Sequence, residues 1–177
     1  MLRPSARRCA GSPRPSPDWP DRMRTGCRLA VDVGAVRVGV ARSDPDGTLA
    51  VPVETVKRGQ GDVARIAALA AEYDVVEVVV GLPVTLGGAE GPAADGARGF
   101  AELVAAAVRP IPVRLVDERL STAAAARGLQ AAGIKQTRGR TRTRDVVDQA
   151  AAVIILQGAL ESERATGNPP GQPVEVA

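Results

Sequence analysis

Three acidic residues stand where a carboxylate needs a specific reason to be. Asp32 lies inside an apolar run, Glu118 follows Asp117 at the end of a second apolar run, and Asp148 lies one turn inside an expected helix. A buried carboxylate is costly unless a cation or hydrogen bonds compensate it. Carboxylate clusters suit Mg²⁺ or Mn²⁺, and a pair of these ions can activate water and stabilise the leaving oxygen in phosphodiester cleavage. If the three residues converge, they predict a metal site for phosphodiester hydrolysis.

Asp32 allows two interpretations. It could cap the tight turn at Gly34, a role that short polar side chains often take. It could instead be a metal ligand, with Gly34 and Gly39 allowing a phosphate backbone to come close, because glycine has no side chain. The strand alone does not distinguish the two.

The other acidic residues also have structural explanations. Asp117 and Glu118 precede an expected helix, where carboxylates favour the positive end of the helix dipole, and Asp145 suits a capping role. Asp148 is harder to explain in this way, since it lies near the helix face that must pack on the sheet. Because adjacent strand residues point to opposite faces, only one of Asp117 and Glu118 can face Asp32. Strand alternation alone does not decide which of the two it is.

The composition removes most other chemistries. The chain contains no His, which excludes imidazole bases, His-metal sites and Ser/His triads. One Trp, one Tyr and one Phe are too few for a platform of stacked bases. Cys9 and Cys27 are too few for a disulfide framework, and the chain has no Cys-x-x-Cys pair. Carboxylates, hydroxyls and cations remain as the groups that could act in catalysis.

Positive charge is concentrated in two segments. The whole chain carries +3, but residues 1–27 hold six Arg against two Asp, so residues 28–177 carry −1. The second segment, 133–144, has five basic residues and no acidic one. Its cations are Lys135, Arg138, Arg140, Arg142 and Arg144. A charged run usually lines solvent, but the position of this one just before Asp148 favours contact with nucleic-acid phosphates.

Hydrophobic periodicity predicts an α/β layer with a mixed sheet. Three β-branched runs joined by turns favour an antiparallel meander, and the later strands are expected to be parallel because helices cross over between them. The predicted strands cover 28–34, 36–43, 50–56, 75–80 and 112–116. The predicted helices begin at 62 and cover 93–108, 121–132 and 144–161.

One domain is expected over residues 27–163. Residues 1–26 contain five prolines and six arginines with little apolar periodicity, so we expect a disordered Pro/Arg-rich tail. Residues 164–177, also rich in Pro and Gly, are expected to form a flexible C-terminal tail. No apolar run approaches the roughly 20 residues that span a bilayer, and no signal peptide is visible, so the expected location is the cytoplasm.

Five motifs occur in an order and spacing typical of one family. They are Asp32-x-Gly34-x-x-Arg37-x-Gly39-x-Ala41, Val79-Val80-Gly81-Leu82-Pro83, Gly88-x-Glu90-Gly91, Asp117-Glu118-Arg119-Leu120-Ser121-Thr122, and the run from Val147-Asp148 to Leu156-Gln157. Together they resemble the YqgF (RuvX) family of RuvC-like nucleases, over about residues 27–161. The chain departs from that pattern at Val116 and Gly158-Ala159, where the family often has an aromatic residue. These are packing positions, so the departures bear on core contacts more than on chemistry.

The resemblance implies an RNase H-like fold, here with a mixed five-stranded sheet flanked by helices. It also implies a metal-dependent nuclease that processes the 5′ end of precursor 16S ribosomal RNA, with ribosomal particles as further partners. Branched DNA is the alternative substrate, since an older label of the family is Holliday junction resolvase. A binding module for nucleic acid or ribosome assembly, without activity, is the alternative of a different class.

The resemblance also implies roles for individual residues. By motif, Asp32, Glu118 and Asp148 would bind Mg²⁺ or Mn²⁺, and Arg37 and Arg119 would contact substrate or support the acidic cluster. Lys135, Arg138, Arg140 and Arg142 are the further substrate-binding candidates, on the strength of their charge.

Overall fold

The computed structural model describes residues 24–85, 87–121 and 144–175. Three predicted segments lie almost entirely outside these residues: the helix at 121–132, the basic run at 133–144 and the N-terminal tail. Among the described helices, none is both long enough and apolar enough to cross a membrane.

The described strands form one mixed sheet in the order β3-β2-β1-β4-β5-β6. β1, β2 and β3 form the predicted antiparallel meander, β4 and β5 run parallel to β1, and β6 is antiparallel to β5. The strands are β1 (Arg28–Val33), β2 (Arg37–Ser43), β3 (Ala50–Lys57), β4 (Glu77–Leu82), β5 (Val113–Asp117) and β6 (Gln172–Pro173). The mixed α/β layer is therefore confirmed, with six strands where five were predicted. The sixth lies in the segment predicted as a flexible tail.

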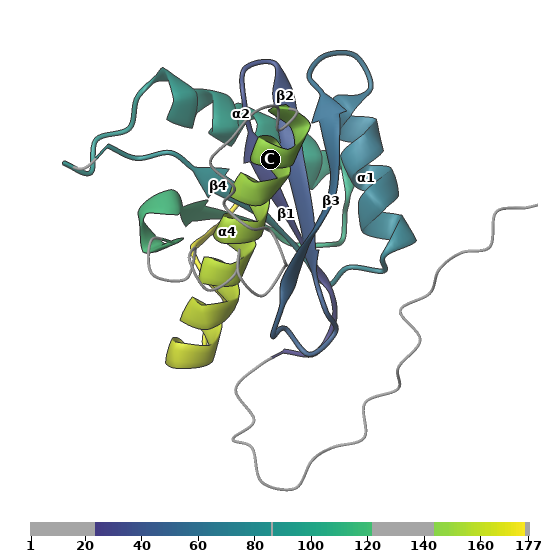
Figure 1. The fold of residues 1–177 in the computed structure, drawn as a ribbon, viewed down its shortest axis with the longest axis vertical. Helices are drawn as coiled ribbons and strands as arrows, with labels where there is room; N and C mark the ends of the chain where they lie inside the picture. The colour runs from purple at the N-terminus through teal and green to yellow at the C-terminus, as the bar shows by residue number, and fades with distance from the viewer. Residues whose placement is uncertain (1–23, 86, 122–143, 176–177) are drawn as a thin grey trace, which may run out of the picture.

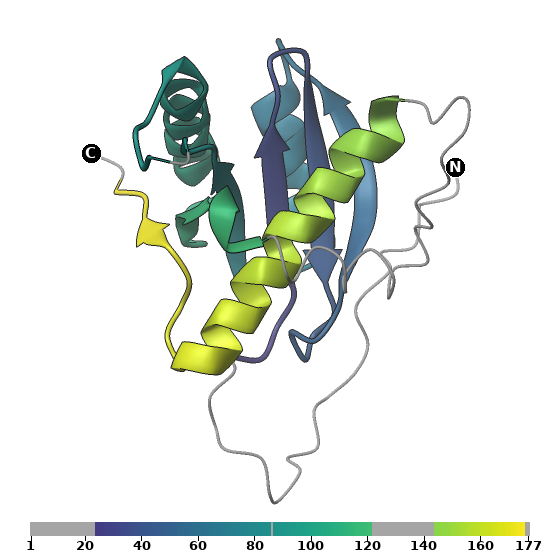
Figure 2. The same ribbon diagram turned by 60° about the vertical axis from the view of Figure 1, so that its left-hand side comes forward.

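Helices cover both faces of the sheet (Figures 1 and 2). α4 (Arg144–Thr166) crosses one face, while α1 (Asp62–Glu72) and α2 (Pro92–Ala107) pack on the other; a short 3₁₀ helix, η1 (Glu118–Ser121), follows β5. Strand alternation divides the core accordingly. Leu29 and Val31 belong to the cluster with α1 and α2, whereas Ala30 belongs to the cluster with α4. Small residues on the α4 side let this helix approach the sheet closely.

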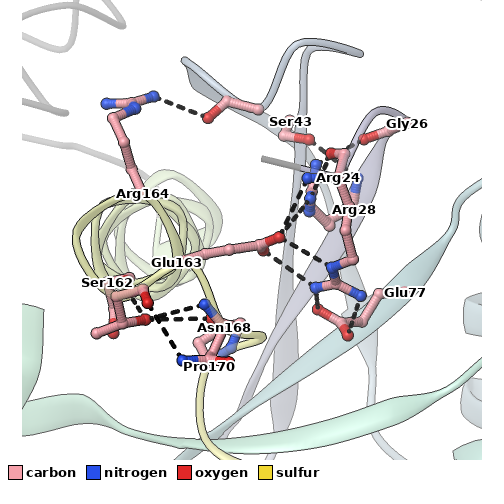
Figure 3. Close-up of polar contacts among 12 residues, drawn as sticks. Arg24, Gly26, Arg28, Ser43, Glu77, Ser162, Glu163, Arg164, Asn168 and Pro170 are labelled. Atoms are coloured by element: carbon pink, nitrogen blue, oxygen red, sulfur yellow. Dashed lines mark hydrogen bonds and ion pairs between the residues drawn. The ribbon is translucent and has the colours of Figure 1, made fainter. Parts of the chain in front are cut away.

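A buried ionic cluster, defined here as Arg24, Arg28, Glu77 and Glu163, lies at the end of the sheet where β1 begins (Figure 3). The Arg28 side chain is 1% exposed and donates from Nη2 to Glu163 Oε1 at 3.1 Å. The Arg24 guanidinium donates to both Glu77 and Glu163, at 2.9–3.0 Å. These contacts begin before residue 27, where the domain was predicted to start. At the other end, α4 continues beyond residue 163, where the domain was predicted to end.

Candidate functional site

Asp32 lies on the face of the sheet that α4 covers. Ala30, two residues earlier, packs under α4, and alternate residues of a strand share a face. Across the β1–β2 pair, Asp32 faces Gly39. A β-carbon at Gly39 would lie 1.9 Å from the carbonyl oxygen of Asp148 and 3.1 Å from the amide nitrogen of Gln149. The absence of a side chain at Gly39 therefore lets α4 bring Asp148 close to Asp32.

This contact corrects the interpretation of the two glycines near Asp32. The sequence suggested that they open space for a phosphate backbone. Instead, the backbone of α4 fills the space above Gly39, and a β-carbon at Gly34 would lie 2.6 Å from the carbonyl oxygen of Arg37. Gly34 closes a tight turn through a hydrogen bond from its amide to that carbonyl, at 2.9 Å.

A second glycine makes room for Glu118. Val31 pairs with Val80 in the parallel β1–β4 ladder, so Gly81 lies beside Asp32 on the other flank. A β-carbon at Gly81 would lie 2.7 Å from Glu118 Oε1. Asp32 thus has a glycine in each neighbouring strand, one beneath the backbone at Asp148 and one beneath the Glu118 carboxylate. Gly81 was not singled out from the sequence as a site residue, although a glycine inside an apolar strand often marks such a close approach.

The carboxylates of the site destabilise one another when charged. Burial, together with the negative charge of Asp148, raises the pKa of Asp32 from an ordinary 3.8 to about 6. Burial also raises the pKa of Glu118, with the charges of Asp32 and Asp117 acting in the same direction. A cation beside these groups would relieve both the lost solvation and the repulsion.

Arg37 is a cation that the structure places at this cluster. Its Nε donates to Asp148 Oδ2 at 2.9 Å, and both side chains are about 30% exposed. Arg37 thus contacts an acidic residue of the site directly, and a contact of Arg37 with substrate stays a prediction. Asp148 also lies close enough to Asp32 for its negative charge to act on that carboxyl group.

Asp117 and Glu118 have different surroundings, since Asp117 ends β5 and Glu118 is the first residue of η1. Asp117 is paired with Arg119, whose Nη2 donates to Asp117 Oδ2 at 2.6 Å. This hydrogen bonding holds the pKa of Asp117 below its ordinary value, against a smaller effect of burial. Glu118, in contrast, interacts with Asp32. The carboxylate that Arg119 contacts directly is therefore that of Asp117.

The structure brings together four of the predicted site residues, Asp32, Arg37, Glu118 and Asp148. Arg119 lies with Asp117, and the candidates Lys135, Arg138, Arg140 and Arg142 lie outside the described residues, as does the side chain of Asp145. Within the described part of the chain, no three acidic or other metal-binding side chains are placed close enough to enclose an ion. The donor set nevertheless fits a hard divalent cation, because it consists of carboxylates, and burial raises the pKa values of two of them, Asp32 and Glu118.

Comparison with known proteins gives consistent results over most of the chain. Residues 26–162 match the RuvX family, which is described as "Holliday junction resolvase". A protein of Thermobifida fusca named "Putative pre-16S rRNA nuclease" is 58% identical over 157 residues, covering 86% of this chain and 98% of the relative. A protein of the same name from Nocardioides sp. is 59% identical over 158 residues, covering 86% of this chain and 99% of the relative.

Solved structures show a similar fold. The structure "T. thermophilus RuvC in complex with Holliday junction substrate" aligns with a TM-score of 0.56 at 17% identity, covering 84% of this chain and 99% of that one. "Thermus thermophilus RuvC structure" aligns with a TM-score of 0.54 at the same identity. At this identity the likeness concerns the fold, and it agrees with the RNase H-like fold that the motifs implied.

Proposed function

The chain belongs to the RuvX family, and from this premise we propose that it is a divalent-metal-dependent nuclease that processes the 5′ end of precursor 16S ribosomal RNA. The observation that carries the proposal is the grouping of Asp32, Glu118 and Asp148 around two glycines of the sheet. The names of relatives at 58–59% identity support the choice of substrate.

Asp32, Glu118 and Asp148 are the residues that would hold the metal ions. Bound Mg²⁺ or Mn²⁺, in a two-metal arrangement, supplies activation of a water molecule and stabilisation of the leaving oxygen. Asp32 is fixed by the central strand β1, Glu118 by η1 directly after β5, and Asp148 by α4 resting on Gly39. Arg37 orients the Asp148 carboxylate through the hydrogen bond to its Oδ2. Three rigid elements therefore position the three ligands.

The basic run 133–144 completes the proposal as a substrate-binding segment. Lys135, Arg138, Arg140 and Arg142 supply several donors just before the helix that carries Asp148. Contacts of this kind with phosphates raise affinity without selecting a base sequence. The choice of RNA would then depend on other features of the substrate, such as its shape.

A cleavage assay with two substrates tests this function. The purified protein is incubated with Mg²⁺ or Mn²⁺ and either a precursor 16S RNA fragment or a four-way DNA junction. We expect cleavage of the RNA. Cleavage of the junction alone would favour the resolvase alternative, for which the family description provides the specific support. Binding of either substrate without cleavage would favour a non-catalytic module.

Matched carboxylate variants test the site in the same assay. Asp32→Asn and Glu118→Gln keep the side-chain shape and remove the charge, so we expect each to lose metal-dependent cleavage while the protein stays folded. Asp117→Asn is the control, because the Asp117 carboxylate is already paired with Arg119. Equal loss from Asp117→Asn and Glu118→Gln in folded protein would contradict the assignment of Glu118.

A further inference from the structure

A pocket of about 360 Å³ lies beside the carboxylate cluster. It is lined by Val36, Arg37, Thr55, Lys57 and Gln149. Arg37 belongs to both places, since its Nε binds Asp148. Gln149 follows Asp148 in α4, and Thr55 faces Gly39 in the β2–β3 ladder. The pocket is therefore a direct continuation of the site toward the β3 edge of the sheet.

Two cations lie opposite each other in this pocket. Arg37 and Lys57 are register partners across the antiparallel β2–β3 pair. Like charges directly opposite in a sheet destabilise the pair. The charge of Arg37 is offset by Asp148, whereas Lys57 is exposed and forms no ion pair within the described residues. An anion bound between them would turn this repulsion into attraction.

The other lining groups also suit a phosphate. Gln149 Nε2 donates to Thr55 Oγ1 at 3.2 Å, which ties α4 to β3 and places uncharged polar groups on the same face. No aromatic side chain lines the pocket, so it lacks a surface on which a base would stack. Among the described residues, no carboxylate lines the pocket either. Glu54, the acidic residue of β3, pairs with Arg65 of α1 on the opposite face of the sheet.

We propose that Arg37, Thr55, Lys57 and Gln149 form a subsite for a backbone phosphate of the nucleic-acid substrate, next to the phosphate that is cleaved. This inference rests on the proposed function and extends it with a position for the strand. The substrate backbone would run from the carboxylate cluster across β2 toward Lys57. Lys57 then acts as a positioning residue, and Arg37 links the subsite to Asp148.

Binding measurements on a cleavage-deficient parent, Asp32→Asn, test the subsite. The probes are a single-stranded RNA and a DNA duplex, each titrated over a range of salt concentrations. Lys57→Gln should lower affinity for both roughly threefold to tenfold, and the slope of log affinity against log salt should fall by about 0.7 for the RNA and about 0.9 for the duplex. Lys57→Arg should restore the slope. Arg109→Gln, which removes an exposed charge after α2 on the other face, should change neither quantity.

Steady-state kinetics on the otherwise wild-type protein supply a second readout. Lys57→Gln should raise KM more than it lowers kcat, because a phosphate contact remote from the scissile bond contributes to ground-state and transition-state binding alike. An unchanged affinity and salt slope in Lys57→Gln would overturn the subsite and leave the proposed function standing. An equal loss in Arg109→Gln would overturn it too, by showing a nonspecific charge effect. A parent that binds neither probe, together with a wild type that cleaves nothing, would overturn both.

Discussion

Asp32 is poorly placed for a charged group unless a cation binds beside it. Burial and the charge of Asp148 raise its pKa to about 6, whereas an unperturbed Asp ionises at 3.8. The unfolded chain therefore gives up this proton at a lower pH than the folded chain does. Ionisation of Asp32 costs folding stability progressively as pH rises from about 4 to about 6, and the full cost persists above that range.

Asp32→Asn should consequently stabilise the metal-free protein at neutral pH. We expect a gain of about 1–2 kcal/mol in the free energy of unfolding above pH 6, shrinking toward zero near pH 4. Urea denaturation in the presence of a chelator, at several pH values, measures this difference. Asp117→Asn is the control and should not stabilise, because Arg119 lowers the pKa of Asp117. A gain of the same size at pH 4 and pH 7 would show that the charge of Asp32 is not the cause.

Individual residues differ in how far the sequence could identify them. Asp32 stands out because an acid inside an apolar strand requires a partner. Asp117 and Glu118 could not be told apart by strand alternation, because β5 ends at Asp117 and Glu118 opens η1. Lys57 was missed because an exposed lysine at a strand end is ordinary until the register places it opposite Arg37. The pair Arg24 and Glu163 was missed because its members are 139 residues apart in the chain, with no local pattern to connect them.

At the scale of elements, the site depends on how closely α4 approaches β2. The contact is between backbones, since the β-carbon position of Gly39 lies 1.9 Å from the Asp148 carbonyl oxygen. A side chain at this position cannot be accommodated by a rotamer change, and the helix itself has to move. The placement of Asp148 relative to Asp32 is therefore a property of the β2–α4 contact.

Gly39→Ala should reduce both stability and cleavage. We expect a loss of at least about 1–3 kcal/mol in unfolding free energy, the usual range for overpacking, together with a fall in kcat as Asp148 is displaced. Gly99→Ala is the matched control: it lies in α2 with open space around its β-carbon position, so alanine should stabilise by up to about 1 kcal/mol. Chemical denaturation and the cleavage assay measure the two effects. A Gly39→Ala protein as stable and as active as wild type would contradict the proposed packing.

The order of elements was predictable because each has a clear period or composition. The valine-rich strands, the helical spacing from residue 62 and the helix-strand alternation all appear in the structure within a few residues. β6 was missed because Gly171 and Pro173 flank or occupy it, a composition typical of loops. Its formation depends on the partner strand: the amide of Val174 donates to the carbonyl of Val113 at 2.8 Å, and Arg114 Nε donates to the Pro170 carbonyl at 2.6 Å.

At the scale of the whole molecule, the ionic cluster joins the N-terminal segment, the sheet and α4. Burial alone would raise the pKa of Glu163, but the hydrogen bond from Arg24 and the charges of Arg28 and Arg24 outweigh it and hold the pKa below its ordinary value. Glu163 therefore contributes stability above its ordinary pKa of 4.5, and this contribution is lost as pH falls below that value.

Glu163→Gln should destabilise the protein strongly, because it leaves the buried Arg28 without its counter-charge. Removing one partner of a buried pair typically costs about 3–5 kcal/mol. Glu90→Gln, which breaks an exposed pair with Arg98, is the matched control and should change stability far less, because solvent screens an exposed pair. Thermal and urea unfolding at pH 7 compare the two. Because the cluster lies at the start of β1 and Asp32 near its end, cleavage per folded molecule should be unchanged; similar small losses from both variants would argue against a stabilising role for the cluster.

The short strand β6 also bears on how this protein behaves toward other copies of itself. An uncovered strand edge offers unpaired amides and carbonyls to neighbouring chains. At the other edge of the sheet, Pro52 and a register shift in the β2–β3 ladder discourage such pairing. β5 has no such device, and β6 occupies its open side (Figure 2). A chain ending at Gly167 should therefore retain its helices and sheet by circular dichroism but self-associate in light-scattering measurements, whereas the full chain at equal concentration should not. Equal scattering by both would show that β5 needs no cover.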